Sequence, residues 1–389
     1  MFSERMNNVK SSAIRDILKI ISKPGMISLA GGLPAPELFP VDAVKKAAER
    51  VLTKFGAEAL QYSFTEGIPA LREKIAEQLN RSAGGLTIDN VLITQGSQQG
   101  LDLIAKVFIN KGSLVMTENP SYLGALQAFQ LFEAAIEPIP SDSHGILVPV
   151  LRERLKKHKP VFLYIMPNFQ NPTGIAYPLD RRRELVAAAR EHDVLIVEDD
   201  PYGELIFEGE RLPTLFSLAG GRNVVRMTTF SKTIAPGLRI ASVAADQELI
   251  KKLVIAKQAT DLHTNSFGQY LVLEYLESGG YEEHIARIRQ TYRERRDVML
   301  AAMEQWFPES VTWNKPAGGM FFWVMLPASW DAAEILLKCI EHNVAFVPGR
   351  EFFPDGSGKN TLRLNFSNAA PQYIEEGIRR MGEVFKTLS

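Results

Sequence analysis

The stretch TTFSKTIAPGLRIAS, residues 228 to 242, places one lysine between hydroxyl residues and a Pro-Gly turn that is followed by an arginine. Lys232 is either a solvated surface charge or a nucleophile whose amine can form a Schiff base with a carbonyl compound. Arg239 can grip a phosphate or a carboxylate through its planar guanidinium. The choice between the two interpretations of Lys232 depends on which other polar side chains the fold brings beside it.

Polar residues also follow several apolar runs of the kind that form buried strands. Asn171 lies in NFQNPTG after the run VFLYIMP, and Asp199 and Tyr202 lie in DDPYGEL, where the run VLIVED ends. In isolation, NPTG is typical of an ordinary turn, and the acidic run is typical of a solvated loop. Because such residues recur at successive strand ends, we expect one shared site.

A phosphate site is indicated where VLIT runs into QGSQQGLDLIAKVF. Gly96 allows a tight turn, and Ser97 and Gln98 open an amphipathic helix whose first N–H groups can bind an anion. Taken alone this signal is weak, since serine at a helix start is more often only an N-cap. Tyr122 follows the run SLVMTENP and adds an aromatic face at a further strand end.

The elements that must position these residues alternate between short apolar runs and Ala- and Leu-rich helical patterns over residues 90 to 245. The pattern predicts an α/β fold with a mainly parallel, seven-stranded sheet between helices. The seven runs are VLIT, SLVMTE, AIEPIP, VFLYIMP, VLIVED, VVRMTT and IASVAA. Such a sheet binds ligands beyond the carboxyl ends of its strands, where the polar residues above are expected.

Outside this region we expect two further parts. Residues 1–40 combine an amphipathic helix, SSAIRDILKIIS, with a Gly-Pro-rich arm that covers the site, and residues 41–284 form the large domain. Residues 285–389 form a smaller α+β domain with strands around GGMFFWVML and TLRLNFS.

Composition excludes several classes of protein. The 44 Lys and Arg residues against 45 Asp and Glu give a formal charge of −1, so no basic excess is present for nucleic acid. No apolar run reaches the roughly 18 residues of a membrane span, and no secretory signal is recognisable, which predicts a cytoplasmic protein. The single cysteine, Cys339, allows no intrachain disulfide and no Cys-based metal cluster, and we expect no metal and a buried thiol.

A lysine, an aspartate, a tyrosine, an asparagine, an aromatic face and a phosphate cradle on one sheet edge suit pyridoxal phosphate. The amine of Lys232 can form a Schiff base with the cofactor's aldehyde, and the carboxylate of Asp199 can keep its pyridine nitrogen protonated. Phenol and amide groups can hydrogen-bond the ring oxygen. Lys232 is therefore better interpreted as the nucleophile.

With these residues in place, the chain resembles the fold-type I, class I aminotransferases, in the branch that contains the α-aminoadipate aminotransferases and kynurenine aminotransferase II. The resemblance spans residues 27 to 367, in family order. It is carried by the stretches ISLAGGLPAPELFP, ALQYSFTEGIPALRE, LITQGSQQGLDL, NFQNPTG, VEDDPYGEL, SKTIAPGLR, LHTNSFGQ, KPAGGMFFW and NVAFVPG…FF…TLRLNFS.

The resemblance implies a role for each site residue. Lys232, Asp199 and Tyr202 would be catalytic, with Asn171 and Tyr202 on the ring oxygen and Tyr122 stacked on the ring. The phosphate would be surrounded by Ser97, Gln98, Thr229, Ser231 and Arg239. Arg363 would pair with the substrate α-carboxylate, helped by Asn171 and the backbone at Gly32. Thr229 departs from the family pattern, where many members carry serine, but its hydroxyl can still donate.

Two further residues depend on the resemblance alone. Tyr62 would reach the phosphate of the neighbouring subunit in a homodimer. Arg15 would lie on the N-terminal helix and bind acidic side chains, and a solvated arginine on a helix face is an equal alternative.

The implied activity is transamination from an amino acid to 2-oxoglutarate in a ping-pong reaction, with an α-aminoadipate, aromatic, kynurenine or leucine-type donor. Two alternatives remain open at this point. One is a lyase or decarboxylase that uses the same cofactor and residues. The other is the effector-binding domain of a transcription regulator, although only 26 residues precede ISLAGGLP, too few for a DNA-binding domain.

Overall fold

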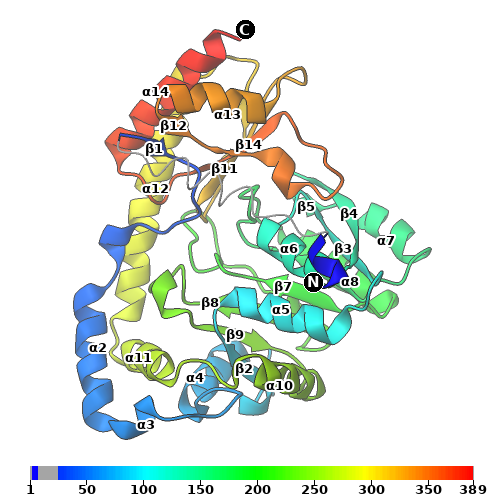
Figure 1. Cartoon of the computed structure of the whole chain (residues 1–389), viewed down its shortest axis with the longest axis vertical. Helices are drawn as coiled ribbons and strands as arrows, with labels where there is room; N and C mark the ends of the chain where they lie inside the picture. The colour runs from blue at the N-terminus through cyan, green and yellow to red at the C-terminus, as the bar shows by residue number, and fades with distance from the viewer. Residues whose placement is uncertain (1, 8–24, 389) are drawn as a thin grey trace.

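The computed structural model describes residues 2–7 and 25–388, and its centre is an eight-stranded sheet with the order β2-β9-β8-β7-β6-β3-β4-β5 (Figure 1). The strands are β2 (Val91–Thr94), β3 (Leu114–Asn119), β4 (Ala135–Asp142), β5 (Gly145–Ile146), β6 (Phe162–Ile165), β7 (Ile196–Asp199), β8 (Val224–Thr229) and β9 (Ala241–Ala244). The pairs from β8 to β4 are parallel, whereas β9 and β5 pair antiparallel with their neighbours.

All seven predicted runs form strands of this sheet. The eighth strand, β5, spans two residues and closes a hairpin with β4. The prediction of seven strands is one short because a two-residue pairing leaves too little sequence for a recognisable pattern.

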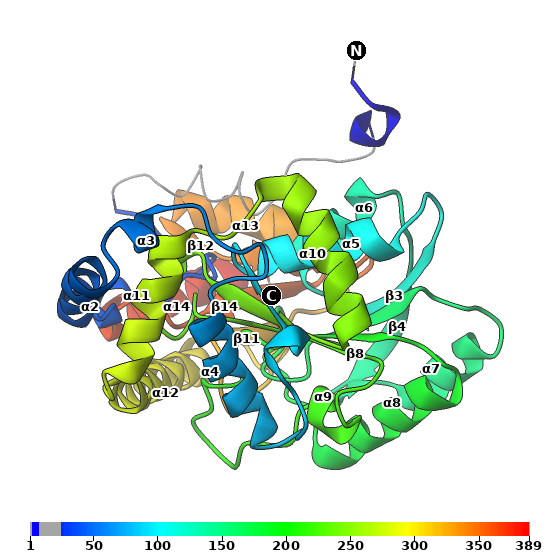
Figure 2. The same ribbon diagram turned by 90° about the horizontal axis from the view of Figure 1, so that it is seen from below.

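Helices cover both faces of the sheet, and side chains alternate between the two faces along each strand. On β6, Phe162 and Tyr164 belong to one apolar core and Leu163 and Ile165 to the other. Figure 2 shows α5 (Ser97–Phe108), α6 (Leu123–Leu131) and α10 (Gln247–Asp261) on the first face, with α4 (Pro69–Asn80), α7 (Val148–Leu155), α8 (Leu179–Glu191) and α9 (Leu215–Leu218) on the second. The other helices that the structure describes before residue 280 are α2 (Val41–Lys54), α3 (Ala57–Leu60) and α11 (Ser266–Glu277).

The C-terminal part of the chain builds a second, four-stranded sheet. Its order is β10 (Thr312–Trp313), β11 (Phe321–Met325), β14 (Thr361–Asn365) and β13 (Val347–Pro348), and it lies beside α13 (Ala332–Glu341) and α14 (Pro371–Lys386). Strands form at GGMFFWVML and TLRLNFS, as the sequence predicts. Cys339 on α13 is fully buried, which confirms the expected packing role.

The N-terminal arm returns to this C-terminal part. Strand β1 (Ile27–Ser28) pairs in parallel with β12 (Val344–Ala345). Helix α12 (Tyr281–Trp306) runs without interruption through the predicted boundary between residues 284 and 285. The division into three domains stays a prediction. Short 3₁₀ turns complete the described chain at Glu4–Asn7, Pro36–Leu38, Ile88–Asn90, Pro236–Leu238 and Gly349–Phe352.

Within residues 2–7 and 25–388, no helix combines the length and apolar character of a membrane span. The same residues contain no cluster of three or more His, Cys, Asp or Glu side chains that could hold a metal ion.

One buried arginine holds the loop after β6, which leads into the site. Arg182, on α8, is 1% exposed. Its guanidinium donates to the carbonyl oxygens of Tyr177 at 2.8 Å, Pro213 at 3.0 Å and Pro167 at 3.2 Å, and to Oδ1 of Asn168 at 2.6 Å. Four acceptors from three stretches of chain, at residues 167–168, 177 and 213, therefore depend on one side chain.

Replacing Arg182 by Met should lower the free energy of unfolding by about 2–5 kcal/mol, because buried acceptors lose their donor. The matched control is Arg183→Met on the same helix. Arg183 is 61% exposed and forms only a long ion pair with Asp180, so its loss should cost about 0.5 kcal/mol or less. Urea denaturation followed by circular dichroism measures both, and equal midpoints for the two variants would contradict the role given to Arg182.

Candidate active site

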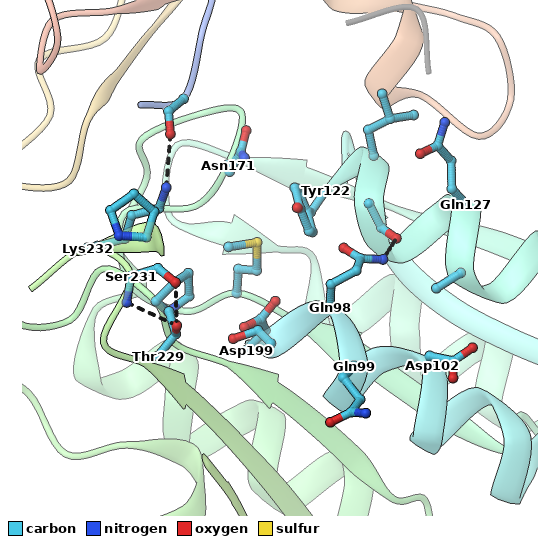
Figure 3. Close-up of a pocket in the computed structure, with 18 of the residues that line it drawn as sticks. Gln98, Gln99, Asp102, Tyr122, Gln127, Asn171, Asp199, Thr229, Ser231 and Lys232 are labelled. Atoms are coloured by element: carbon cyan, nitrogen blue, oxygen red, sulfur yellow. Dashed lines mark hydrogen bonds between the residues drawn. The ribbon is translucent and has the colours of Figure 1, made fainter. Parts of the chain in front are cut away.

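A cavity of about 950 Å³ lies at the carboxyl edge of the central sheet (Figure 3). Its lining includes the ends of strands β6, β7 and β8, the start of α5, the loop before α6, and one residue from β14. The predicted residues that line it are Gly32, Ser97, Gln98, Tyr122, Asn171, Asp199, Tyr202, Thr229, Ser231, Lys232, Arg239 and Arg363. The structure thus brings together residues that are spread over more than 300 positions of the chain.

Lys232 follows the end of β8 and is half-buried in this cavity. Its Nζ donates to the carbonyl oxygen of Gly32 at 2.9 Å. Burial, with smaller contributions from the positive charges of Arg363 and Arg239, lowers the pKa of Lys232 to about 8. Far more of the neutral, nucleophilic amine is therefore present at neutral pH than for a lysine in water.

Asp199 ends β7 and is 2% exposed. Its Oδ2 accepts a hydrogen bond from the hydroxyl of Tyr164 at 2.8 Å, while its Oδ1 has no partner among the described residues. Burial raises the pKa of Asp199 to about 7, against the opposing effect of the Tyr164 hydrogen bond. A buried carboxylate with one unpaired oxygen fits a protonated ring nitrogen.

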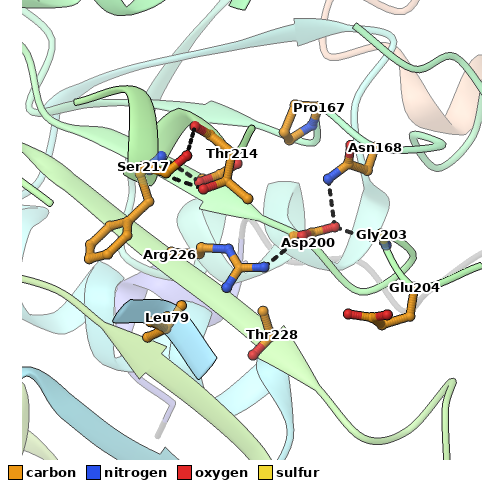
Figure 4. Close-up of polar contacts among 12 residues, drawn as sticks. Leu79, Pro167, Asn168, Asp200, Gly203, Glu204, Thr214, Ser217, Arg226 and Thr228 are labelled. Carbon is orange, nitrogen blue, oxygen red and sulfur yellow. Dashed lines mark hydrogen bonds and ion pairs between the residues drawn. The ribbon is translucent and has the colours of Figure 1, made fainter. Parts of the chain in front are cut away.

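The acidic run Glu198-Asp199-Asp200 is buried throughout and forms no solvated loop. Asp200 accepts hydrogen bonds from Nδ2 of Asn168, the backbone N–H of Gly203 and the guanidinium of Arg226, each at 2.9 Å (Figure 4). Burial alone would raise the pKa of Asp200, but the charge of Arg226 and the hydrogen bonds from Asn168 and Arg226 together outweigh burial and lower it. Asp200 thereby ties the loop after β7 to β8 and to the loop after β6.

Arg363, on β14, is a buried cation that contacts another predicted site residue, Asn171. It donates to Oδ1 of Asn171 at 2.6 Å and to the carbonyl oxygen of Ala30 at 2.7 Å, and its guanidinium lies 4.3 Å from the ring centre of Phe321. Its Nε has no partner, and no carboxylate pairs with it in the described chain. Burial lowers the pKa of Arg363 to about 10, which leaves it charged at neutral pH. This arrangement fits a bound carboxylate.

Tyr202 lies in the short loop after β7, close to Asn171. A hydrogen bond with Asn171 opposes the effect of burial, which raises the pKa of the Tyr202 phenol well above its ordinary value. Tyr202 therefore stays a neutral phenol that can donate a hydrogen bond. Tyr122, at the start of α6, is also held neutral because burial raises its pKa.

The other end of the cavity fits a phosphate. The hydroxyl of Ser97, at the N-terminus of α5, is buried and has no hydrogen-bond partner among the described residues. Arg239 adopts a left-handed conformation with φ 54° and has no carboxylate partner within the described ranges. At Gly96, with φ 76°, an added Cβ would lie 2.2 Å from the Arg239 guanidinium, so only glycine fits this turn. Thr229 and Ser231 complete the hydroxyl groups on this side through their mutual hydrogen bonds.

These features meet the requirements of pyridoxal phosphate. An amine with a lowered pKa, an unpaired buried carboxylate oxygen and an unpartnered hydroxyl at a helix start lie in one cavity. The cofactor predicted from the sequence therefore fits the residues present.

One predicted residue, Tyr62, lies away from the cavity, and a second, Arg15, belongs to a part of the chain that the structure does not describe. Tyr62 is 78% exposed and contacts the ring of His263, 5.8 Å away, rather than this chain's own cavity. Arg15 lies outside the described residues. The roles given to both stay predictions.

Tyr164 is a site residue that sequence analysis missed. The signal was a tyrosine inside the otherwise apolar run VFLYIMP, because a buried phenol needs a hydrogen-bond partner. Gln95, Met166 and Asp102 also line the cavity without having been predicted.

Comparisons with known proteins agree with this geometry. The family model described as "Aminotransferase class I and II" matches residues 24–381. The chain is 45% identical over 390 residues to a 2-aminoadipate transaminase of Thermus thermophilus, covering 100% of this chain and 97% of the relative. It is 44% identical over 392 residues to aromatic-amino-acid aminotransferase 1 of Thermococcus litoralis, covering 99% and 94%.

A solved structure resembles the fold over its whole length. The crystal structure of an α-aminoadipate aminotransferase from Thermus thermophilus, complexed with N-(5'-phosphopyridoxyl)-L-leucine, has a TM-score of 0.93 at 44% identity, covering 100% of this chain and 97% of that one. The bound group joins the cofactor's pyridoxyl phosphate part to an amino acid. From the matched family model, the full-length relatives and the chemistry of the cavity, the chain belongs to the class I and II aminotransferases and depends on pyridoxal phosphate.

Proposed function

We propose that the enzyme transfers the amino group of an amino acid to 2-oxoglutarate in a ping-pong reaction. The proposal rests on two groups that line the same cavity. Arg363 is a buried cation without a carboxylate partner in the described chain, and Lys232 is an amine whose pKa is lowered to about 8. The first group suits the α-carboxylate of a substrate, and the second suits a proton transfer at its Cα.

When bound, pyridoxal phosphate supplies an aldehyde that accepts the amino group and a ring that takes up the charge left when Cα loses its proton. The chain would hold it through Lys232, Asp199 and Tyr202, with Asn171 beside the ring oxygen and Tyr122 on the ring. Its phosphate would be bound by Ser97, Gln98, Thr229, Ser231 and Arg239, and by the partner subunit's copy of the Tyr62 loop.

The residues of the chain then have separate tasks. Arg363, Asn171 and the backbone at Gly32 bind the α-carboxylate and so fix the orientation of the Cα–H bond. The Nζ of Lys232 accepts the proton from Cα, which a pKa near neutrality favours. Asp199, deep in the cavity, holds a proton at the ring nitrogen.

The donor is proposed from the names of the relatives. α-Aminoadipate, aromatic and kynurenine, or leucine-type amino acids are the candidates, and broad specificity is expected. Arg15 is the residue proposed to bind acidic side chains. A cytoplasmic location also stays a prediction.

The decisive experiment is a half-reaction without an acceptor. α-Aminoadipate, phenylalanine, kynurenine and leucine are each mixed with the holoenzyme, and one equivalent of oxo acid and of pyridoxamine phosphate per site is expected. Added 2-oxoglutarate should restore the original absorbance. Release of carbon dioxide, or of a side-chain fragment with the cofactor left as the aldehyde, would instead establish the decarboxylase or lyase alternative.

Lys232→Ala should reduce this half-reaction by at least about a thousandfold, because both the nucleophile and the proton acceptor are lost. Lys251→Ala, at an exposed position of α10, is the control and should retain normal rates. Turnover of Lys232→Ala near that of the control would refute the assignment of Lys232.

The lowered pKa of Lys232 predicts how the apoenzyme takes up its cofactor. Below pH 8 the protonated amine dominates and cannot attack the aldehyde, so the covalent step should accelerate as pH rises and level off above about pH 8 to 9. Stopped-flow absorbance of apoenzyme mixed with pyridoxal phosphate measures this, with Lys232→Ala as the blank. A rate that still climbs toward pH 10.5 would show an ordinary lysine.

We also propose a homodimer in which Tyr62 serves the partner's site. Three large apolar side chains within five residues are exposed in the single chain, namely Leu60 at 71%, Tyr62 at 78% and Phe64 at 62%. Such a cluster favours coverage by another chain.

Mixing Lys232→Ala with Tyr62→Phe subunits tests the shared site. Each hybrid dimer would have one doubly altered site and one intact site, so random exchange should restore about a quarter of the wild-type sites. Tyr62→Phe alone must first be shown to be impaired. Demonstrated subunit exchange without recovered activity would argue against sharing.

A further inference from the structure

We propose that Tyr164 is a positioning residue that turns the Asp199 carboxylate and keeps the shared proton on the nitrogen of the cofactor ring. The inference rests on the role proposed for Asp199. Its basis is geometric: the Tyr164 hydroxyl, 2.8 Å from Oδ2, is the only side-chain donor to Asp199 among residues 2–7 and 25–388, and Oδ1 is left unpaired.

The sheet register explains why this tyrosine reaches this aspartate. Tyr164 on β6 pairs with Val197 on β7, its parallel neighbour. Asp199 lies two residues beyond Val197 and therefore on the same face of the sheet, about 7 Å farther along the strand. A phenol ring on Tyr164 spans that distance, whereas a shorter side chain would leave Oδ2 without a donor.

Packing prevents Tyr164 from turning away. Its ring is fully buried and meets the edge of Phe129, with ring centres 5.6 Å apart at 75°. Burial and the adjacent Asp199 charge raise the pKa of the Tyr164 phenol well above its ordinary value. The hydroxyl is therefore protonated and available to donate at neutral pH.

The Tyr164 hydrogen bond affects the cofactor ring because the Asp199 carboxylate and the ring nitrogen compete for one proton. A carboxylate that already accepts a hydrogen bond on Oδ2 is a weaker base at Oδ1. A proton between Oδ1 and a pyridine nitrogen then resides on the nitrogen, and the ring stays electron-withdrawing. Without the Tyr164 hydroxyl, the proton shifts toward the carboxylate and the ring accepts charge less well.

Other titratable groups surround Asp199 but do not replace Tyr164. Those with an electrostatic effect on or from its carboxyl are Asp200, Glu118, Tyr122 and Tyr202. Asp200 acts on Asp199 through charge alone and raises its pKa, as burial does, whereas the charge of Asp199 raises the pKa of Glu118. Only the Tyr164 hydrogen bond opposes the effects of burial and Asp200 on the pKa of Asp199.

The test compares two Tyr→Phe variants of the holoenzyme. Tyr164→Phe removes one oxygen and keeps the ring, so folding should persist. The control is Tyr177→Phe, because Tyr177 is also fully buried and donates to a buried carboxylate, Glu118, at 2.6 Å, but makes no contact with Asp199. Tyr164→Phe loses one hydrogen bond, whereas Tyr177→Phe loses two, because the Tyr177 hydroxyl also accepts from the backbone N–H of Ile146. The control should therefore lose at least as much thermal stability as Tyr164→Phe.

The readout specific to the proposal is a pH titration of the bound cofactor's visible absorbance. In Tyr164→Phe the less electron-withdrawing ring makes the lysine–cofactor linkage more basic, and its midpoint should rise by roughly 0.5 to 1 pH unit. The kcat should fall by about tenfold to a hundredfold, while the donor KM changes by less than about threefold because Arg363 is untouched. Tyr177→Phe should leave the midpoint and kcat near wild type.

An unchanged midpoint in Tyr164→Phe, or an equal shift in Tyr177→Phe, would overturn the proposal and leave Tyr164 with a structural role only. Asp199→Asn separates this failure from failure of the proposed function. If Asp199→Asn leaves the cofactor's absorbance and turnover unchanged, Asp199 itself has been wrongly assigned. If Asp199→Asn is impaired and Tyr164→Phe is not, only the inference about Tyr164 falls.

Discussion

The site depends on charged groups that the fold removes from water without providing an opposite charge. Asp199 and Arg363 are each about 98% buried, and neither forms an ion pair within the described part of the chain. Burial of this kind opposes folding and raises or lowers each pKa toward the neutral form. In the proposed function, a cofactor with a protonated ring and a substrate with a carboxylate would supply the opposite charges. Binding would therefore favour the ionised forms of Asp199 and Arg363, which burial alone disfavours.

Hydrogen-bond networks around the site stabilise the fold and offset the cost of burying Asp199 and Arg363. Asp200 next to Asp199 is fully satisfied, with Arg226, Asn168 and Gly203 as donors. Arg182 similarly satisfies four acceptors, two of them at Pro167 and Asn168 in the loop that leads to Asn171. Side chains whose hydrogen bonds are complete, such as Asp200 and Arg182, thus lie one residue or one loop away from site residues that keep unpaired polar atoms. The contrast between Asp199 and Asp200 marks which of two adjacent carboxylates is free to meet a ligand.

Sequence reasoning found the residues whose position follows from strand ends alone. Lys232, Asp199 and Asn171 each follow an apolar run, and the carboxyl ends of parallel strands meet at one edge. Tyr164 could not be found in this way because its contact with Asp199 depends on the register between β6 and β7. The short strand β5 carries too few residues for a pattern. Tyr62 depends on a second chain, which a single sequence does not contain.

The N-terminal arm limits where the chain can accept an inserted or deleted residue. Ala30 accepts a hydrogen bond from Arg363, and Gly32, two residues later, accepts one from Lys232. Strand β1 fixes the start of the arm against β12, and at Gly32 an added Cβ would lie 3.2 Å from the ring of Phe321. An inserted or deleted residue between positions 30 and 32 would therefore move one carbonyl out of reach of its partner. The spacing of these two carbonyl groups therefore matches the separation of the lysine from the arginine, and a change in the length of the arm would break that match.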